Sequence, residues 1–348
     1  MLINRLLLFI VGFCVGTLFV QLHWPIPYML GGMLTAIACK SFARKVEVTW
    51  PMRFREYALT AVGYGIGANF SQEAWQNILS QSVGVLEATA SIFLASFVLS
   101  YLTAKLTGED HKSCLMGMLP GGLTVMMVLS EEDKEVNPNI VAVMQVLRLV
   151  MVVVSVPFLV IYLLNAKVLT SSLTAPNLGG YHWVIFVPLA ILGVFIARKL
   201  HFPTPTMLGP IFATALFAVV AGRVQPIPAW IMCPAQLCIG LYMGMQLDVE
   251  RIMRTKKMIP YIVFATIVMI AISIGMSYVL SERYGFSLIT AFLAMSPGGI
   301  AEMSLAGLSM GENVSVILTY QLVRILTMTM FVPYFLKHAF KRKTDLDV

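Results

Sequence analysis

Long apolar segments alternate with short polar loops along the whole chain. Most of these segments approach the roughly 20 residues that a helix needs to cross the hydrocarbon core of a bilayer. The pattern therefore predicts an all-α polytopic membrane protein. The segments run roughly over residues 5–22, 26–42, 55–70, 82–105, 113–130 and 139–165 in the first half, and over 183–199, 205–221, 230–247, 258–281, 287–310 and 314–336 in the second.

The two halves repeat the same short motifs in the same order, which indicates an internal duplication. It predicts a first membrane repeat, residues 1–173, and a second, residues 174–348, that together form one integrated transmembrane domain. Such repeats are typical of secondary transporters, whose substrate sites lie at the interface between repeats. The matches, at offsets of 178, 177 and 176 residues, are His23–Gly31 with His201–Gly209, Pro120–Gly122 with Pro297–Gly299, and Gln145–Arg148 with Gln321–Arg324.

The fifth segment of each half carries a Pro-Gly-Gly at its centre. Segments 113–130 and 287–310 cannot be continuous helices without freeing backbone groups at Pro120 and Pro297. Each segment either spans as a broken helix or enters the bilayer and turns back as a re-entrant hairpin.

The distribution of Lys and Arg favours the hairpins. Without Arg148 and Arg324, which lie inside segments, 22 basic residues remain; twelve spanning segments would place 15 of them in cytoplasmic loops and 7 outside. Two re-entrant hairpins change this count to 19 inside and 3 outside, which satisfies the positive-inside rule far better. The prediction is therefore two inverted repeats, each of about five spanning helices plus one hairpin, with both termini in the cytoplasm.

Composition excludes a soluble globular protein. Hydrophobic residues make up 58% of the chain and charged residues only 12%, whereas globular domains carry about 25% charged residues. The mean hydropathy is +0.83. The N-terminal apolar run is read as a retained span, because no small-residue cleavage site follows it. The net charge of +7 is assigned to topology, so the expected partner is the lipid bilayer and not nucleic acid.

The cysteines and histidines show no metal-ligand spacing. The five cysteines lie in or beside apolar segments, and no two histidines stand four residues apart on a helix. We therefore expect no metal, no cofactor and no enzymatic activity.

The two Pro-Gly-Gly tips are the first candidate for a binding site. In an inverted repeat, Gly121 and Gly122 reach toward the bilayer centre from one face, and Gly298 and Gly299 from the other. Each tip begins a half-helix, whose free N–H groups attract an anion or a carboxylate. The alternative is that the motif only allows close packing of a kinked helix.

Two buried Gln-x-x-Arg pairs are the second candidate. Arg148 and Arg324 lie near the middle of apolar helices, where a charge costs at least about 2.5–3.5 kcal/mol and needs a partner or a wet cavity. Gln145 and Gln321 lie three residues earlier, on the same helix face. Two interpretations stay open for each arginine: it contacts a substrate anion through its planar fork, or it bridges to hairpin carbonyls or a buried acid.

Acids inside the segments are few. Glu302 lies in the first turn of its half-helix, and its counterpart in the repeat is Val125. It is a candidate for a proton or sodium site that couples transport, or for the partner of Arg324; helix capping is the simpler alternative. Glu87 is a weaker candidate of the same kind.

Glycine-rich stretches occur at matching places in the two halves. They are Gly63–Gly67 and Gly240–Gly244. We expect them to permit close helix packing.

Taken together, the doubled Pro-x-Pro-x-Met-Leu-Gly element, the Pro-Gly-Gly and the Gln-x-x-Arg helix resemble the AbrB family of bacterial inner-membrane proteins. That family is distinct from the soluble DNA-binding regulator of the same name. The resemblance covers nearly the whole chain and implies an inner-membrane location. Members of the family are labelled as transporters, as regulators of gene expression or as an ammonia monooxygenase.

Three functions are compared. A secondary transporter of a small, organic carboxylate-like anion explains the repeat, the broken segments and the paired arginines. A ligand-binding membrane sensor or regulator would use the same site without flux. A monooxygenase would need metal ligands that the scattered histidines and cysteines do not supply. A homo-oligomer is compatible with each of them.

The charge count predicts which loops face the cytoplasm. Cysteine-accessibility labelling in intact cells should leave the loop at Arg251–Lys257 unlabelled from outside and should label the loop near Arg223. Labelling of Arg251–Lys257 from outside would contradict the inverted repeat and restore six parallel spans in each half.

Overall fold

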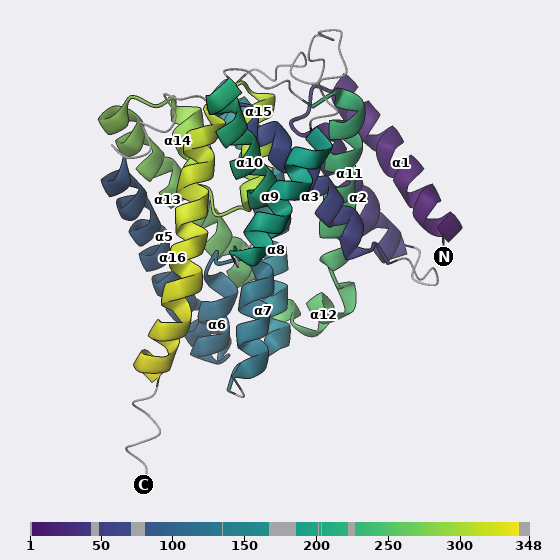
Figure 1. Ribbon diagram of the computed structural model, residues 1–348. Helices are drawn as coiled ribbons and strands as arrows, with labels where there is room; N and C mark the ends of the chain where they lie inside the picture. The colour runs from purple at the N-terminus through teal and green to yellow at the C-terminus, as the bar shows by residue number, and fades with distance from the viewer. Residues whose placement is uncertain are drawn as a thin grey trace.

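The protein is a bundle of α-helices (Figure 1). The computed structural model describes residues 2–42, 49–70, 81–133, 135–166, 186–200, 202, 204–221 and 227–340, and no strand occurs among them. The first half contains α1 (Leu2–Gln21), α2 (Pro27–Phe42), α3 (Met52–Gly67), α5 (Ser82–Thr107), α6 (His111–Met118), α7 (Leu123–Glu132) and α8 (Pro138–Leu163). The second half contains α9 (Phe186–Lys199), α10 (Pro205–Ala221), α11 (Ala229–Gln246), α12 (Val249–Arg254), the 3-10 turn η3 (Lys256–Met258), α13 (Ile259–Tyr284), α14 (Leu288–Met295), α15 (Ile300–Ser309) and α16 (Val314–Phe340).

Within these ranges, five helical stretches are long and apolar enough to cross a membrane. Large apolar side chains such as Leu94 and Phe264 face outward from them, which suits contact with lipid. The expectation of an all-helical protein with the character of a multi-pass membrane protein is confirmed. The stretches are Ile3–Gln21, Ser82–Thr107, Pro138–Leu163, Lys256–Tyr284 and Val314–Phe331.

Both Pro-Gly-Gly segments are interrupted, as predicted. The first divides into α6 and α7, with a break at residues 119–122, and the second into α14 and α15, with a break at residues 296–299. Figure 1 shows α6 and α7 at one end of the bundle and α14 and α15 at the other. We call these units the first and the second helix pair.

Helices of the two halves pack against each other in reciprocal combinations. In the centre α2 lies on α11 and α3 on α10, while α1 covers α2 and α9 covers α10. The first helix pair packs on α8 and α5, and the second on α16 and α13. Exchanging the halves therefore leaves these pairings unchanged, whereas the packing of α15 on α3 has no equally extensive counterpart between α7 and α11.

Glycines let the central helices approach to backbone contact. A β-carbon on Gly240 of α11 would lie 2.0 Å from the carbonyl oxygen of Met29 in α2, and one on Gly63 of α3 would lie 2.5 Å from that of Met207 in α10. The prediction that the two glycine-rich stretches permit close packing is confirmed.

The repeated Pro-x-Pro element shares an unusual backbone conformation. Ile26 and Thr204, at equivalent positions, have φ values of 40° and 52°. Each then accepts the first helical hydrogen bonds: Met29 N–H donates to Ile26 at 3.1 Å and Met207 N–H to Thr204 at 3.0 Å. A left-handed conformation is rare for side chains branched at Cβ, so its occurrence at both positions extends the repeat from the sequence to the backbone.

The proposed boundary between the repeats lies outside the described residues. It falls at residues 173 and 174, within the stretch 167–185 that the structure does not describe. The division into 1–173 and 174–348 stays a prediction.

Substitution of the close-packed glycine should destabilise the bundle. We expect Gly240→Ala to force α2 and α11 apart, at a cost of about 1–3 kcal/mol, as for other overpacked sites, and to lower the melting temperature in detergent. Gly275→Ala is the matched control, because no atom lies within 4 Å of a β-carbon there; it should be neutral or stabilising by up to about 1 kcal/mol. Equal melting temperatures of the two variants would contradict the close packing.

Candidate functional site

The break in the first helix pair leaves carbonyl groups at the end of α6, and side chains from α8 bind them. Gln145 donates from Nε2 to the carbonyls of Met116 at 2.7 Å and Leu119 at 2.8 Å. Arg148 donates from Nη1 to the carbonyl of Met118 at 2.5 Å. These bonds satisfy groups that a broken helix would otherwise leave unpaired in an apolar interior.

The second helix pair is bound in the same way by α16. Gln321 donates from Nε2 to the carbonyls of Leu293 and Ser296, both at 3.0 Å. Arg324 donates from Nη1 to Ser296 at 2.7 Å and from Nη2 to Gly298 at 2.8 Å. The two ends of the molecule therefore use one device.

Each arginine is also fixed by the glutamine of its own helix. Arg148 Nη2 donates to Gln145 Oε1 at 2.7 Å, and Arg324 Nη2 donates to Gln321 Oε1. The shared helix face predicted from the spacing is confirmed. Of the two interpretations kept open for the arginines, the bridge to backbone carbonyls of the interrupted segment is present in both halves.

The arginines are buried, and no ion pair neutralises either of them within the described part of the chain. Arg148 is 4% exposed and Arg324 is 3% exposed. The Nε atom of each has no hydrogen-bond partner, and the two guanidinium groups lie close enough to repel each other electrostatically. The centre of the molecule therefore holds a surplus of positive charge.

The expected pair between Arg324 and Glu302 is wrong. No ion pair joins them, because the terminal nitrogens of Arg324 already bind carbonyls and Gln321. Glu302 instead accepts from its own backbone N–H and interacts electrostatically with Arg55 of α3.

The glycines at the first tip show where conformation demands glycine. Gly122, the N-cap of α7, has φ +91°, which strains any residue with a β-carbon. A β-carbon on Gly121 would lie 3.4 Å from Cβ of Met328 in α16. The first tip therefore lies against the second half, one turn beyond Arg324.

The second tip is organised differently. Gly299, the N-cap of α15, has φ −86°, so its conformation does not require glycine. A β-carbon there would lie 2.0 Å from Oε2 of Glu302, and one on Gly298 would lie 2.7 Å from the flexible end of Met303. A side chain at Gly299 would therefore take the space of the Glu302 carboxylate, although the backbone conformation at this position would accept it.

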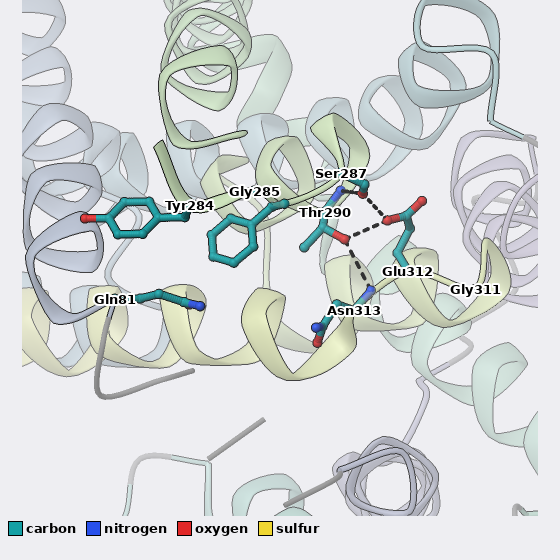
Figure 2. Close-up of a pocket in the computed structure, with 9 residues that line it drawn as sticks. Gln81, Tyr284, Gly285, Ser287, Thr290, Gly311, Glu312 and Asn313 are labelled. Carbon is teal, nitrogen blue, oxygen red and sulfur yellow. Dashed lines mark hydrogen bonds between the residues drawn. The ribbon is translucent and has the colours of Figure 1, made fainter. Parts of the chain in front are cut away.

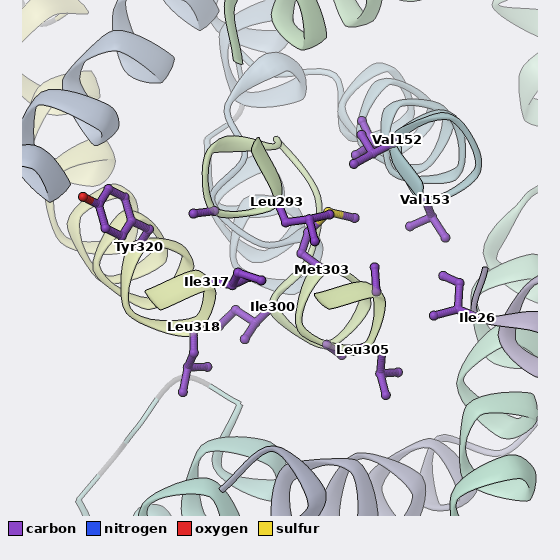
Figure 3. Close-up of a cluster of buried hydrophobic side chains, with 14 of the residues drawn as sticks. Ile26, Val152, Val153, Leu293, Ile300, Met303, Leu305, Ile317, Leu318 and Tyr320 are labelled. Carbon is purple, nitrogen blue, oxygen red and sulfur yellow. The ribbon is translucent and has the colours of Figure 1, made fainter. Parts of the chain in front are cut away.

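Figure 3 shows the second tip packed between α16 and α8. Ile300 and Met303 of α15 belong to one buried apolar cluster with Val152 and Val153 of α8, one turn beyond Arg148. Helix α15 also packs on α8, so each helix pair reaches the long helix that carries the other pair's arginine.

Glu87 lies elsewhere. Its carboxylate binds Nη1 of Arg283, at the end of α13, at 2.9 and 2.8 Å, and both side chains are about half exposed. The structure joins Glu87 to the surface end of the other half and does not bring it to the glycine tips.

Both helix pairs are closed at their base by a hydroxyl that the sequence reading missed. Ser113 Oγ accepts from the backbone N–H of Asn137 at 2.8 Å, and Thr290 Oγ1 accepts from that of Asn313 at 3.2 Å. The two hydroxyl residues and the two asparagines stand at repeat offsets of 177 and 176. Comparison of the halves position by position would have revealed this element.

Charged groups reinforce each base differently. In the second pair, Glu312 accepts from Thr290 Oγ1 at 2.6 Å and from Ser287 Oγ, beside a polar cavity of about 370 Å³ (Figure 2). In the first, Lys112 binds Asp133 and Glu135. Partial burial lowers the pKa of Lys112, but the hydrogen bond to Glu135 and the two carboxylate charges outweigh it, so the pKa is raised overall.

Comparison with known proteins shows matches along most of the chain. A family model described as "Transition state regulatory protein AbrB" matches residues 28–339. "Uncharacterized protein YhjN" of Bacillus subtilis (strain 168) is 29% identical over 283 residues, covering 76% of this chain and 73% of the relative. "Putative regulator AbrB" of Escherichia coli (strain K12) is 22% identical over 317 residues, covering 90% of both. These matches agree with the resemblance read from the doubled motifs.

The geometry predicts which side chains are coupled energetically. In a double-mutant cycle on unfolding free energy in detergent, Arg324→Ala and Gln321→Ala should be coupled by about 0.5–3 kcal/mol, because they share one set of carbonyls. Arg324→Ala and Glu302→Gln should add to within about 0.5 kcal/mol. Coupling between Arg324 and Glu302, with additive effects for Arg324 and Gln321, would instead indicate an ion pair between Arg324 and Glu302.

Proposed function

This chain belongs to the AbrB family, and from that premise and the geometry of the helix pairs we propose that it is a secondary transporter of a small organic anion. The observation that carries the proposal is the pair of buried arginines, 4% and 3% exposed, without an acidic partner in the described structure. An unpaired buried cation is costly, so a bound anion would stabilise the centre.

The membrane arrangement in this proposal is an inverted repeat. It comprises ten spans and two re-entrant hairpins in a bacterial inner membrane, with both termini in the cytoplasm. The reciprocal packing of the halves and the position of the two helix pairs at opposite ends of the bundle support it (Figure 1). The basic stretch around α12 lies at the end of the bundle that holds the first helix pair. In this proposal, that end faces the cytoplasm.

The helix dipoles at the tips add little net potential, so the guanidinium groups supply the positive charge of the site. Neither α7 nor α15 has a side-chain cap at its N-cap residue, and each helix start carries about half a positive charge. The end of α6 or α14 carries about half a negative charge, which cancels that of the neighbouring helix start. The full charge of each guanidinium remains, and it attracts an anion.

Substrate contact and carbonyl binding are compatible roles for the arginines. The terminal nitrogens hold the tips in place, while Nε–H of Arg148 and of Arg324 has no partner and is available to a carboxylate oxygen. In this proposal Gly121, Gly122, Gly298 and Gly299 bring the helix starts close to the bound anion, and Gln145 and Gln321 orient the guanidinium groups.

A ligand-binding regulator is the second candidate. The names of the family model and of the Escherichia coli relative favour it. The same anion site would then act without flux. The two candidates differ in one measurable property, which is exchange of the anion across a membrane.

Binding can be tested first, by thermal shift of the detergent-purified protein. We expect small carboxylates such as acetate, lactate, pyruvate or succinate to raise the melting temperature, by the equivalent of about 2.7 kcal/mol at a hundredfold excess over Kd. Amines should have no effect. Stabilisation by amines alone would contradict the anion site.

Flux then separates transporter from regulator. Proteoliposomes loaded with the stabilising carboxylate should accumulate its labelled form by counterflow, and an Arg148→Lys variant, which keeps the charge but loses the planar fork, should lose most of the accumulation. Arg283→Lys, at the exposed ion pair with Glu87, is the control and should behave as wild type. Binding without counterflow would favour the regulator.

A further inference from the structure

Among the residues whose exposure the structure describes, Glu302 is the one acidic residue with less than a tenth of its surface exposed. It is 8% exposed and lies in the first turn of α15, directly behind the second tip. Its counterpart in the first half is Val125. Half of the site therefore carries a carboxylate and the other half does not.

The helices that pack against α15 carry three buried or half-buried arginines. These helices are α3, α8, α14 and α16. Helix α14 contributes no titratable side chain, and Glu56 of α3 is turned to Arg198 at 3.9 Å. Among the residues whose exposure the structure describes, the other buried or half-buried titratable side chains of these helices are Arg55 and Tyr64 of α3, Arg148 of α8, and Tyr320 and Arg324 of α16.

In the described structure, the Glu302 carboxylate forms no ion pair within 4 Å with any of these arginines. Helix α3 brings Arg55, whose guanidinium lies over the ring of Tyr242 at 5.0 Å. Glu302 is thus held in place by its own backbone N–H and by the space that Gly299 leaves. It can change its charge without dismantling the carbonyl bonds of Arg324.

We propose that Glu302 takes up a proton from solvent when the anion binds, so that the protein binds and moves the anion together with H⁺. This inference rests on the proposed anion site. An anion between the two guanidinium groups repels a carboxylate at the neighbouring helix start and favours its neutral form. By linkage, protonation of Glu302 strengthens anion binding by the same factor.

A proton fits the site better than a metal cation. A cation would need several oxygen ligands, and the described residues contain no group of three His, Cys, Asp or Glu side chains. A proton requires only the carboxylate oxygen itself. Each binding event then takes up at most one proton together with the anion.

Calorimetry of anion binding tests the inference on the unmodified protein. Acetate, lactate, pyruvate and succinate are titrated into wild-type protein in two buffers of different ionisation enthalpy, between about pH 7 and about pH 9, where these probes are ionised. We expect uptake of up to one proton per anion. The affinity should fall by up to about tenfold per pH unit wherever Glu302 is ionised in the free protein.

Variants locate the proton. Glu302→Gln should bind the anion with no proton uptake and with an affinity independent of pH, close to the wild-type value at low pH. Glu87→Gln, which removes a surface acid paired with Arg283, is the matched control and should keep the wild-type pH dependence.

The outcomes separate the two claims. Anion binding by the wild type without proton uptake, or uptake that persists in Glu302→Gln, would overturn the role of Glu302 and leave the anion site standing. If none of the four probes binds at any pH, the anion site itself fails and this inference fails with it.

Discussion

The structure depends on how a broken helix satisfies its backbone carbonyls away from water. A carbonyl without a partner in a bilayer costs several kcal/mol, and each Pro-Gly-Gly break exposes several of them. Two side chains three residues apart on a neighbouring helix satisfy them in both halves: Gln145 and Arg148 on α8, and Gln321 and Arg324 on α16. The breaks and the buried charges therefore explain each other.

The same contacts place positive electrostatic potential at the centre of the molecule. Guanidinium groups that bind neutral carbonyls keep their full charge, and the helix starts at the tips lie beside them. The first tip also lies against Met328 of α16, and α15 packs on α8, so each helix pair contacts the long helix that carries the other pair's arginine. At the tips the symmetry is broken where Gly122 adopts a positive φ and where Glu302 replaces Val125.

Much of this could be predicted from the sequence, because the constraints involved are local. The helical segments, the two interruptions, the glycine contacts and the shared face of each glutamine and arginine all follow from periodicity or spacing. Partner choice does not. The sequence left Arg324 free to bind Glu302 or a carbonyl, and only the fold shows that the end of α14 reaches its guanidinium first.

Other features were missed because their signal lies in comparing the halves position by position. None of these residues has a distinctive sequence signal when one half is considered alone. They are the left-handed residues Ile26 and Thr204, and Ser113 and Thr290, whose hydroxyls close the bases of the helix pairs. Glu87, the weaker candidate for a coupling site, could not be placed from the sequence either, because Arg283 comes from the other half to bind it at the surface.

In the proposed arrangement, two broken helix pairs meet from opposite sides of the membrane around a pair of arginines that bind an anion. Cryo-electron microscopy of the protein in lipid nanodiscs, with and without a saturating carboxylate, tests it most directly. We expect the lipid belt to be centred on the level of Gly122 and Gly299, and added density to appear between Arg148 and Arg324 only with the carboxylate. A belt that leaves both tips on one side of the membrane, or density for the carboxylate away from the arginines, would contradict it.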